Sequence, residues 1–275
     1  MSPNRTLPND IDDLDPAPAG PASAAVPPWP YPTWIAHRGA GRLAPENTLA
    51  AFRAGAALGW RAFECDVKLS ADGVPFLLHD DTLERTTDAA GSAGDLNWAD
   101  LARLDAGGWH SRLHAGEPPC SLDAIAAFCL RNGHLLNLEL KPVPGDEERT
   151  GQIVAQAVRQ RWGEAVRDGL SVWPLLSSFE PRTLAAAREA VPELPRALLL
   201  DTLAPDCFDI AERLDCVAVI LEESLIHADL VRTLHHDGLR VLAYTVNDAG
   251  RAELLLDLGL DGLITDAVDT FVPTT

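Results

Sequence analysis

Residues 62–79 read Ala-Phe-Glu-Cys-Asp-Val-Lys-Leu-Ser-Ala-Asp-Gly-Val-Pro-Phe-Leu-Leu-His. They contain two apolar runs of strand character, 62–67 and 74–79. Only six residues separate these runs, whereas a helical crossover between parallel strands needs about a dozen or more. The separating segment includes Asp72-Gly73, which is a turn signal. We therefore predict that the second run folds back antiparallel to the first.

This return arm would bring His79 roughly opposite Asp66. Whether it counts as a barrel strand determines how many parallel strands the chain has. Apolar runs and alanine- and leucine-rich amphipathic stretches alternate along the chain, which indicates βα units. Without the arm, eight runs remain, and they predict a (β/α)8 TIM-type barrel. The alternative, in which the arm is itself a barrel strand reached without a helix, stays open. The nine runs are 34–37, 62–67, 74–79, 135–140, 174–178, 196–200, 217–221, 240–245 and 262–265.

The rest of the chain divides into a tail, a barrel and an insertion. Residues 1–32 carry nine prolines and predict a flexible N-terminal tail, followed by one barrel domain over 33–275. Residues of about 80–121 fit no βα unit and predict a small insertion after the second strand and its return arm. We expect the first helix to have Asn47 as its N-cap. The predicted helices are 48–58, 152–162, 181–190, 208–214, 228–237 and 249–258.

Composition narrows the class of protein. The net charge of −19 argues against a nucleic-acid binder and means that local cations must bind any anionic substrate. The five scattered cysteines form no Cys-x-x-Cys pair and suit reduced thiols. No apolar run approaches the roughly 18 residues that span a bilayer, and the N-terminus lacks a signal-peptide core. We expect a cytoplasmic protein without stable membrane insertion; the residues carry no signal for an oligomeric state.

Polar side chains stand at the ends of several of the apolar runs. Residues two apart in a strand share a face, so Glu64 and Asp66 point the same way while Cys65 points oppositely. Each such motif alone is more often a solvated or structural feature, but their recurrence at the same end of successive runs favours a functional site. The polar residues are His37, Arg38, Glu64, Asp66, His79, Glu139 and Lys141.

Carboxylates that meet at strand ends repel one another unless they are protonated or bind a cation. Glu64, Asp66 and Glu139 therefore predict a site for one divalent metal ion with oxygen ligands, Mg²⁺ or Ca²⁺.

The other polar residues add the remaining parts of a catalytic site. His37 and His79 can titrate near neutral pH, as general acid–base catalysis requires. Arg38 and Lys141 supply the fixed positive charge that suits a phosphate.

In order and spacing, these motifs resemble the glycerophosphodiester phosphodiesterase family over residues 34–270. The opening signature is the clearest part, with His37-Arg38-Gly39 followed by Pro45-Glu46-Asn47-Thr48. The inserted segment, Leu104 to Glu117, also resembles that of the family. The other matching motifs are Glu64-Cys65-Asp66-Val67, Asp72-Gly73, His79-Asp80, Leu138-Glu139-Leu140-Lys141, Ser177-Ser178-Phe179, Tyr244-Thr245-Val246-Asn247 and Asp261–Asp266.

The resemblance implies a (β/α)8 barrel that hydrolyses a small-molecule glycerophosphodiester to glycerol 3-phosphate and an alcohol. His37 and His79 would be the general base and acid, in an order left open, and Tyr244 would face the glycerol where the family commonly has tryptophan. Attack by a glycerol hydroxyl through a cyclic phosphate and attack by water both stay open. The implied metal ligands are Glu64, Asp66 and Glu139, and the implied phosphate contacts are Arg38 and Lys141.

Three alternatives stay open. A lysophospholipase D-like or other phospholipid head-group phosphodiesterase would share the site and need an apolar mouth, which Trp98 and Trp109 could supply. A metal-dependent isomerase or aldolase would need more histidine ligands or a Schiff-base lysine, and only Lys141 stands at a strand end. A catalytically silent binding barrel would not need His37 and His79.

Overall fold

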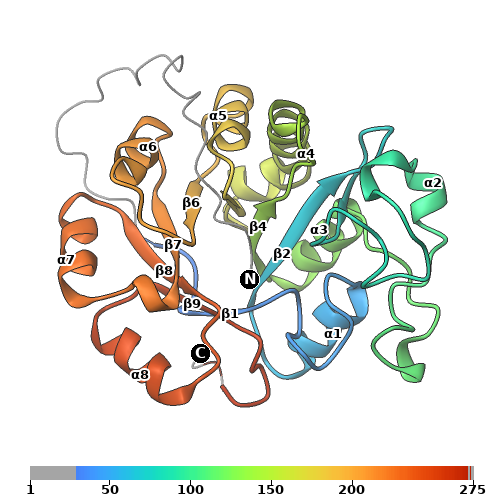
Figure 1. Cartoon of the computed structure of the whole chain (residues 1–275), viewed down its shortest axis with the longest axis horizontal. Coiled ribbons are helices and arrows are strands. Elements are labelled where there is room, and N and C mark those ends of the chain that lie inside the picture. The colour runs from blue at the N-terminus through green and yellow to red at the C-terminus, as the bar shows by residue number, and fades with distance from the viewer. Residues whose placement is uncertain (1–28, 272, 274–275) are drawn as a thin grey trace.

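Eight parallel strands close into a barrel in the computed structural model, which describes residues 29–271 and 273 (Figure 1). The strands follow one another around the barrel, and pairing between the first and second closes it. The predicted (β/α)8 fold is therefore confirmed. The strands are β1 (Trp34–Ala36), β2 (Ala62–Leu69), β3 (Pro75–Leu77), β4 (Leu135–Leu140), β5 (Leu175–Ser178), β6 (Arg196–Leu200), β7 (Ala218–Glu222), β8 (Arg240–Tyr244) and β9 (Gly262–Thr265).

The ninth strand, β3, is the antiparallel return arm that the turn signal predicts. It pairs with β2 so that Val67 lies opposite Leu77. The chain reverses at Gly73, whose φ of +80° favours glycine. The N–H of Leu78 donates to the carbonyl oxygen of Asp66 at 3.1 Å. Leu78, not His79, thus lies opposite Asp66, and the predicted alignment was wrong by one residue.

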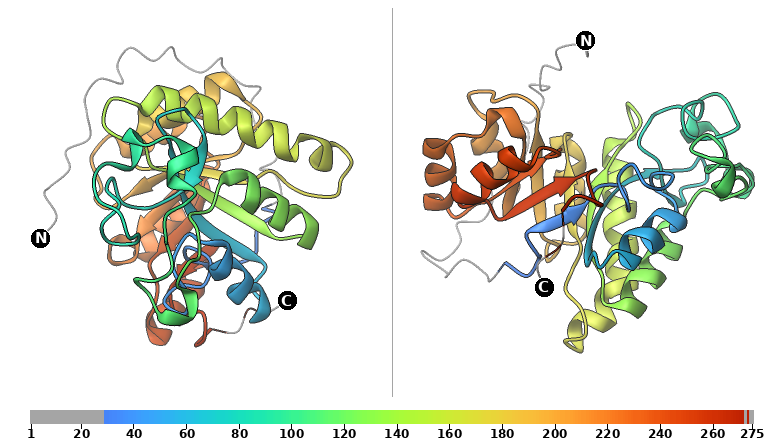
Figure 2. Two further views of the ribbon diagram at one scale, coloured as in Figure 1. Left: turned by 90° about the vertical axis from the view of Figure 1, so that its right-hand side faces the viewer. Right: turned by 90° about the horizontal axis from the view of Figure 1, so that it is seen from below.

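Helices cover the outside of the barrel, as Figure 2 shows from two further sides. The N-cap of the first helix is Thr48, whose hydroxyl accepts from the N–H of Ala51, so the prediction of Asn47 was wrong. The helix that begins after Ser121 was not predicted. The helices are α1 (Leu49–Ala57), α2 (Trp98–Leu101), α3 (Leu122–Asn132), α4 (Glu147–Arg167), α5 (Pro181–Ala190), α6 (Cys207–Arg213), α7 (Ala228–His236) and α8 (Ala249–Asp257), with 3-10 turns η1 (Ala93–Asp95), η2 (Arg112–His114) and η3 (Glu223–Leu225).

Strand alternation divides the core into two layers. On β2, Cys65 belongs to the layer between the strands and the helices, together with Phe63 and Val67. The lumen holds a separate apolar cluster that includes Ile220 and Leu242. The residues on β2 that alternate with Cys65 are polar, so the lumen changes from apolar to charged along this strand.

Two segments lie outside the βα units. The predicted tail, residues 1–32, falls outside the described residues as far as position 28. Within the described remainder, Tyr31 is buried, and its hydroxyl donates to the carbonyl oxygen of Trp173 at 2.8 Å. The segment between β3 and α3, which carries α2, lies to one side of the barrel (Figure 1). It has a small apolar cluster that includes Leu83 and Leu101. Among residues 29–271, no helix is long and apolar enough to cross a membrane.

Replacing Cys65 tests the assignment of the two faces of β2. Cys65→Ser puts a hydroxyl into an apolar layer, and we expect the free energy of unfolding to fall by about 1–3 kcal/mol because a buried hydroxyl without a partner is costly. Cys65→Ala is the matched control and should lose less. Urea unfolding measures both. Equal stability of the serine variant and the wild type would place this side chain in a polar environment, contrary to the structure.

Candidate active site

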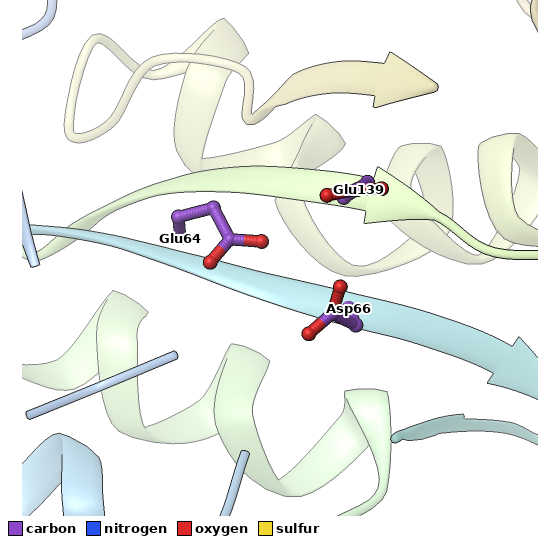
Figure 3. Close-up of side chains that lie close together, drawn as sticks. All are labelled: Glu64, Asp66 and Glu139. Carbon is purple, nitrogen blue, oxygen red and sulfur yellow. The ribbon is translucent and has the colours of Figure 1, made fainter. Parts of the chain in front are cut away.

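Three carboxyl groups converge inside the barrel from the adjacent strands β2 and β4 (Figure 3). The register of the two parallel strands pairs Asp66 with Glu139, and Glu64 lies two residues earlier on the face of Asp66. One oxygen from each of the three side chains lies within 4.8 Å of the others, and all three residues are buried. The structure thus brings together the three predicted metal ligands.

The hydrogen bonds of these carboxylates leave oxygens unused. Glu64 Oε2 accepts from the N–H of Arg38 at 3.1 Å, and Asp66 Oδ2 accepts from Asn47 Nδ2 at 2.8 Å. Among the described residues, Glu64 Oε1 and Asp66 Oδ1 are buried without a hydrogen-bond partner. Glu139 Oε1 lies 2.6 Å from Lys141 Nζ in an ion pair. A hard divalent cation, which prefers carboxylate oxygens, fits this donor set.

Burial and mutual repulsion decide the charges of these groups in the metal-free protein. Burial raises the pKa of Glu64 to about 8, and the negative charge of Asp66 adds to the effect. Burial also acts to raise the pKa of Asp66, but the charges of Arg38 and Lys141 outweigh it and hold that pKa well below its usual range. Burial also raises the pKa of Glu139, although the charge of Lys141 opposes it. Two of the three carboxyl groups are thus incompletely compensated, as expected of ligands for an additional cation.

His37 is held between two carboxylates. Its Nε2 lies 3.6 Å from Glu64 Oε2, and its Nδ1 lies 2.6 Å from Asp266 Oδ1. Asp266 is oriented in turn by Asn247, whose side-chain oxygen accepts from the N–H of Asp266 at 2.8 Å. Burial acts to lower the pKa of His37, but the hydrogen bond with Asp266 and the charge of Glu64 outweigh it and raise the pKa.

His79 has a similar partner at the end of the return arm. Its Nδ1 lies 2.7 Å from Asp80 Oδ1. Burial lowers the pKa of His79, and the nearby charges of Lys141 and Arg38 lower it further. Because Asp266 and Asp80 contact the Nδ1 atoms at hydrogen-bond distance, Nε2 is in both histidines the nitrogen that can exchange a proton with a substrate; that of His37 lies 3.6 Å from Glu64, beyond hydrogen-bond distance.

The cations stand around the same cluster. Arg38 Nε lies 3.2 Å from Asp66 Oδ2, and Lys141 Nζ lies 5.3 Å from the centroid of the Phe179 ring. A cavity of about 390 Å³ opens beside them, large enough for a small molecule. Its lining residues are Lys68, His79, Asp80, Asp81, Glu139, Leu140, Lys141, Pro142, Ser178, Phe179 and Glu180.

Tyr244 does not line this cavity itself but packs against Phe179, which does. Its ring packs edge-on against Phe179, with the centroids 5.8 Å apart, and its hydroxyl donates to the carbonyl oxygen of Leu200 at 3.3 Å. A larger cavity of about 660 Å³ is lined by Tyr31, Trp173 and other residues at the amino ends of the strands. It contains none of the predicted site residues, so we place the site at the smaller cavity.

Two polar residues of the site, Lys68 and Asp266, were not predicted from the sequence. Lys68 is fully buried on the lumen face of β2, and its Nζ donates to Asp81 Oδ1 at 2.7 Å. It follows Glu64 and Asp66 in the same alternation, so the rule that found those two could have found it. Asp266 directly follows β9, and the rule of polar residues at strand ends applied to it as well.

The pH dependence of the metal-free protein tests the burial of Glu64. Its folded pKa of about 8 lies above the ordinary pKa of a glutamate, 4.5, so the folded protein holds an extra proton between these pH values. The free energy of unfolding should therefore fall as pH rises through that window. In EDTA we expect the wild type to lose a few kcal/mol relative to Glu64→Gln, at about 1.4 kcal/mol per pKa unit. Parallel unfolding curves for the two proteins from pH 5 to 8 would contradict this.

Comparisons with known proteins agree with the fold and identify the family. The model of the glycerophosphoryl diester phosphodiesterase family matches residues 37–270. YhdW of Bacillus subtilis is 31% identical over 248 residues, which cover 86% of this chain and 96% of that protein. The glycerophosphodiester phosphodiesterase of Caldanaerobacter subterraneus subsp. tengcongensis is 28% identical over 239 residues, covering 86% and 95% of the two chains.

Solved structures give the same result. An Oleispira antarctica phosphodiesterase, in complex with the product sn-glycerol-3-phosphate, is 34% identical and superposes with a TM-score of 0.78, covering 86% of this chain and 93% of that chain. Glycerophosphodiester phosphodiesterase from Agrobacterium tumefaciens superposes with a TM-score of 0.73 at 28% identity, covering 89% and 100% of the two chains. Because the family match runs from the end of β1 to beyond β9, this chain belongs to the glycerophosphoryl diester phosphodiesterase family and is a phosphoric diester hydrolase.

Proposed function

We propose that this enzyme hydrolyses glycerophosphodiesters to glycerol 3-phosphate and an alcohol with the help of one divalent ion, Mg²⁺ or Ca²⁺. The observation that carries the proposal is the pair of buried, unbonded oxygens on Glu64 and Asp66, which lie beside Glu139. The Oleispira antarctica relative, whose structure contains sn-glycerol-3-phosphate as product, supports the choice of product.

Glu64, Asp66 and Glu139 would hold the ion through one oxygen each. When bound, the ion supplies positive charge that stabilises the negative charge developing on the phosphoryl oxygens. Arg38 and Lys141 would bind the remaining phosphate oxygens. Both are partly buried, with side chains 18% and 20% exposed, so their attraction for an anion is less screened than on an open surface.

His37 and His79 would move the protons of the reaction. One removes the proton of the attacking hydroxyl, and the other donates a proton to the oxygen of the leaving alcohol. Asp266 and Asp80 fix the Nδ1 atoms, which keeps each Nε2 turned away from its carboxylate partner. This arrangement serves a glycerol hydroxyl or a water molecule as the nucleophile.

The cavity wall favours a small glycerophosphodiester over a lysophospholipid. Tyr244 and Phe179 would form the apolar side against the glycerol. An acyl chain would need an apolar mouth, but neither tryptophan of the inserted segment lines the cavity. Trp98 packs on Phe76 with the ring centroids 6.0 Å apart, and Trp109 Nε1 donates to the carbonyl oxygen of Ala106 at 2.8 Å.

The free, buried state of all five cysteines supports a cytoplasmic location.

Product analysis tests the proposal. The protein is incubated with glycerophosphocholine, glycerophosphoethanolamine or a lysophospholipid, in Mg²⁺ or Ca²⁺, and glycerol 3-phosphate is quantified. We expect it from the first two substrates, and none after EDTA treatment. Glu64→Gln and Asp66→Asn keep the size of the side chain but remove the charge that holds the ion, so both should abolish metal-stimulated release. Release of a phosphorylated head group in place of glycerol 3-phosphate would refute the proposed reaction.

Substitution of the histidines tests their roles. His37→Ala and His79→Ala should each lower turnover by about 10²–10⁴, the usual contribution of a positioned acid or base. His235→Ala is a matched control, because His235 is 35% exposed and pairs with Asp261 at 2.9 Å, much as the 33% exposed His79 pairs with Asp80. The control should keep wild-type turnover. Steady-state kinetics on the folded variants measures this. A histidine whose variant keeps the wild-type rate takes no part in the mechanism.

A further inference from the structure

Arg85 joins two distant parts of the site from within the segment between β3 and α3. Its Nη1 and Nη2 donate to the two carboxylate oxygens of Glu46, both at 2.8 Å. Its Nε and Nη2 donate to the two oxygens of Asp80 at 2.6 and 3.0 Å. All three guanidinium nitrogens are thus engaged, and each carboxylate is bound through both of its oxygens, a geometry that the planar fork of arginine allows and lysine does not.

Both carboxylates in turn contact a residue of the proposed machinery. Asp80 Oδ1 lies 2.7 Å from His79 Nδ1, and Glu46 Oε1 accepts from Arg38 Nη1 at 2.8 Å. The contacts therefore form one chain, His79–Asp80–Arg85–Glu46–Arg38. Its two ends are a proposed proton-transfer group and a proposed phosphate contact, which otherwise stand on different loops.

The charges explain why the chain needs Arg85 at its centre. Glu46 is mostly buried, with 14% of its side chain exposed, and Arg38 is its other cationic partner. Without Arg85, Glu46 would draw the Arg38 guanidinium to itself and compete with a bound phosphate. Asp80 would likewise lose the two bonds that fix its direction toward His79.

The position of Arg85 is set by the packing of the inserted segment. Leu83, two residues earlier, is 1% exposed and belongs to the apolar cluster of this segment. Thr87, two residues later, is buried, and its hydroxyl donates to the carbonyl oxygen of Leu83 at 2.7 Å. The turn that carries Arg85 is therefore ordered by the apolar cluster of this segment, which also contains Phe76 of β3.

We propose that Arg85 is a positioning residue, which orients His79 through Asp80 and Arg38 through Glu46 and so makes the catalytic geometry depend on the inserted segment. The inference rests on the proposed function. A residue of this kind changes turnover and substrate binding together and changes metal binding at Glu64, Asp66 and Glu139 far less, because its own hydrogen bonds go to Glu46 and Asp80 and it reaches Asp66 only through Glu46 and Arg38.

The test compares Arg85→Ala with Arg161→Ala. Arg161 is a matched control: its side chain is 44% exposed against 43% for Arg85, and it binds Asp123 through two nitrogens on the outer surface. With glycerophosphocholine, Arg85→Ala should lose about 10–100-fold in kcat, the usual effect of removing a partner that orients a site residue, and should also raise KM. Guanidinium ion at low millimolar concentration should restore part of the turnover. Arg161→Ala should show neither effect.

Two further measurements keep the outcomes distinct. Calorimetric titration with Mg²⁺ or Ca²⁺ should show a much smaller change in metal affinity than in kcat for Arg85→Ala, and Arg85→Lys should fold with the wild-type Tm yet remain impaired in kcat. Wild-type kinetics in Arg85→Ala, a loss of metal affinity in parallel with activity, or full activity in Arg85→Lys would overturn the positioning role alone. An inactive wild type in the same assay would overturn the proposed function, and the inference with it.

Discussion

Three carboxyl groups buried within 4.8 Å of one another are the constraint on which the rest of the site depends. Removal of a carboxylate from water is costly, and repulsion between like charges adds to the cost. Fixed cations offset part of this cost, because Arg38 and Lys141 each lie within 4 Å of Asp66. Glu64 has no such ion pair with a lysine or arginine among the described residues. This need for positive charge is the reason that we propose the cluster as the metal site.

The barrel can hold these buried carboxylates because successive residues of β2 face two different environments, the apolar layer under the helices and the lumen. Phe63, Cys65 and Val67 join the apolar layer under the helices, while Glu64 and Asp66 face the lumen. The apolar layer stabilises the fold without help from the charged residues. The polar groups can therefore be placed for binding and proton transfer. In a chain of net charge −19, these local cations, not the field of the whole protein, would attract a phosphodiester.

The sequence predicted the parts of the molecule that depend on local pattern. Period-two alternation gave the common face of Glu64 and Asp66, and Asp72-Gly73 gave the return arm. Contacts between distant segments could not be predicted in this way. Asn47 looked like a helix cap, but its side chain is engaged by Asp66, a contact that exists only after the barrel forms. Asp266 contacts His37 because β1 pairs with β9. These two residues are 229 positions apart in the sequence.

The inserted segment shows a different limit. Residues around Arg85 follow neither the helical nor the strand period, so no pattern indicated which of their side chains would face the site. The segment was recognised as an insertion, and its role in holding Asp80 and Glu46 emerged only from the geometry. A polar residue in an irregular segment is therefore easy to overlook even when it joins two parts of a catalytic centre.

We propose that Glu64, Asp66 and Glu139 together hold the catalytic ion. The most direct measurement is an anomalous-difference map from a crystal of the protein grown with Mn²⁺, a substitute that prefers the same oxygen ligands. The account predicts one peak within bonding distance of a carboxylate oxygen from each of the three residues, about 2–2.5 Å. A peak bound elsewhere, or no peak between these carboxylates in a crystal whose dissolved protein is active with Mn²⁺, would contradict it.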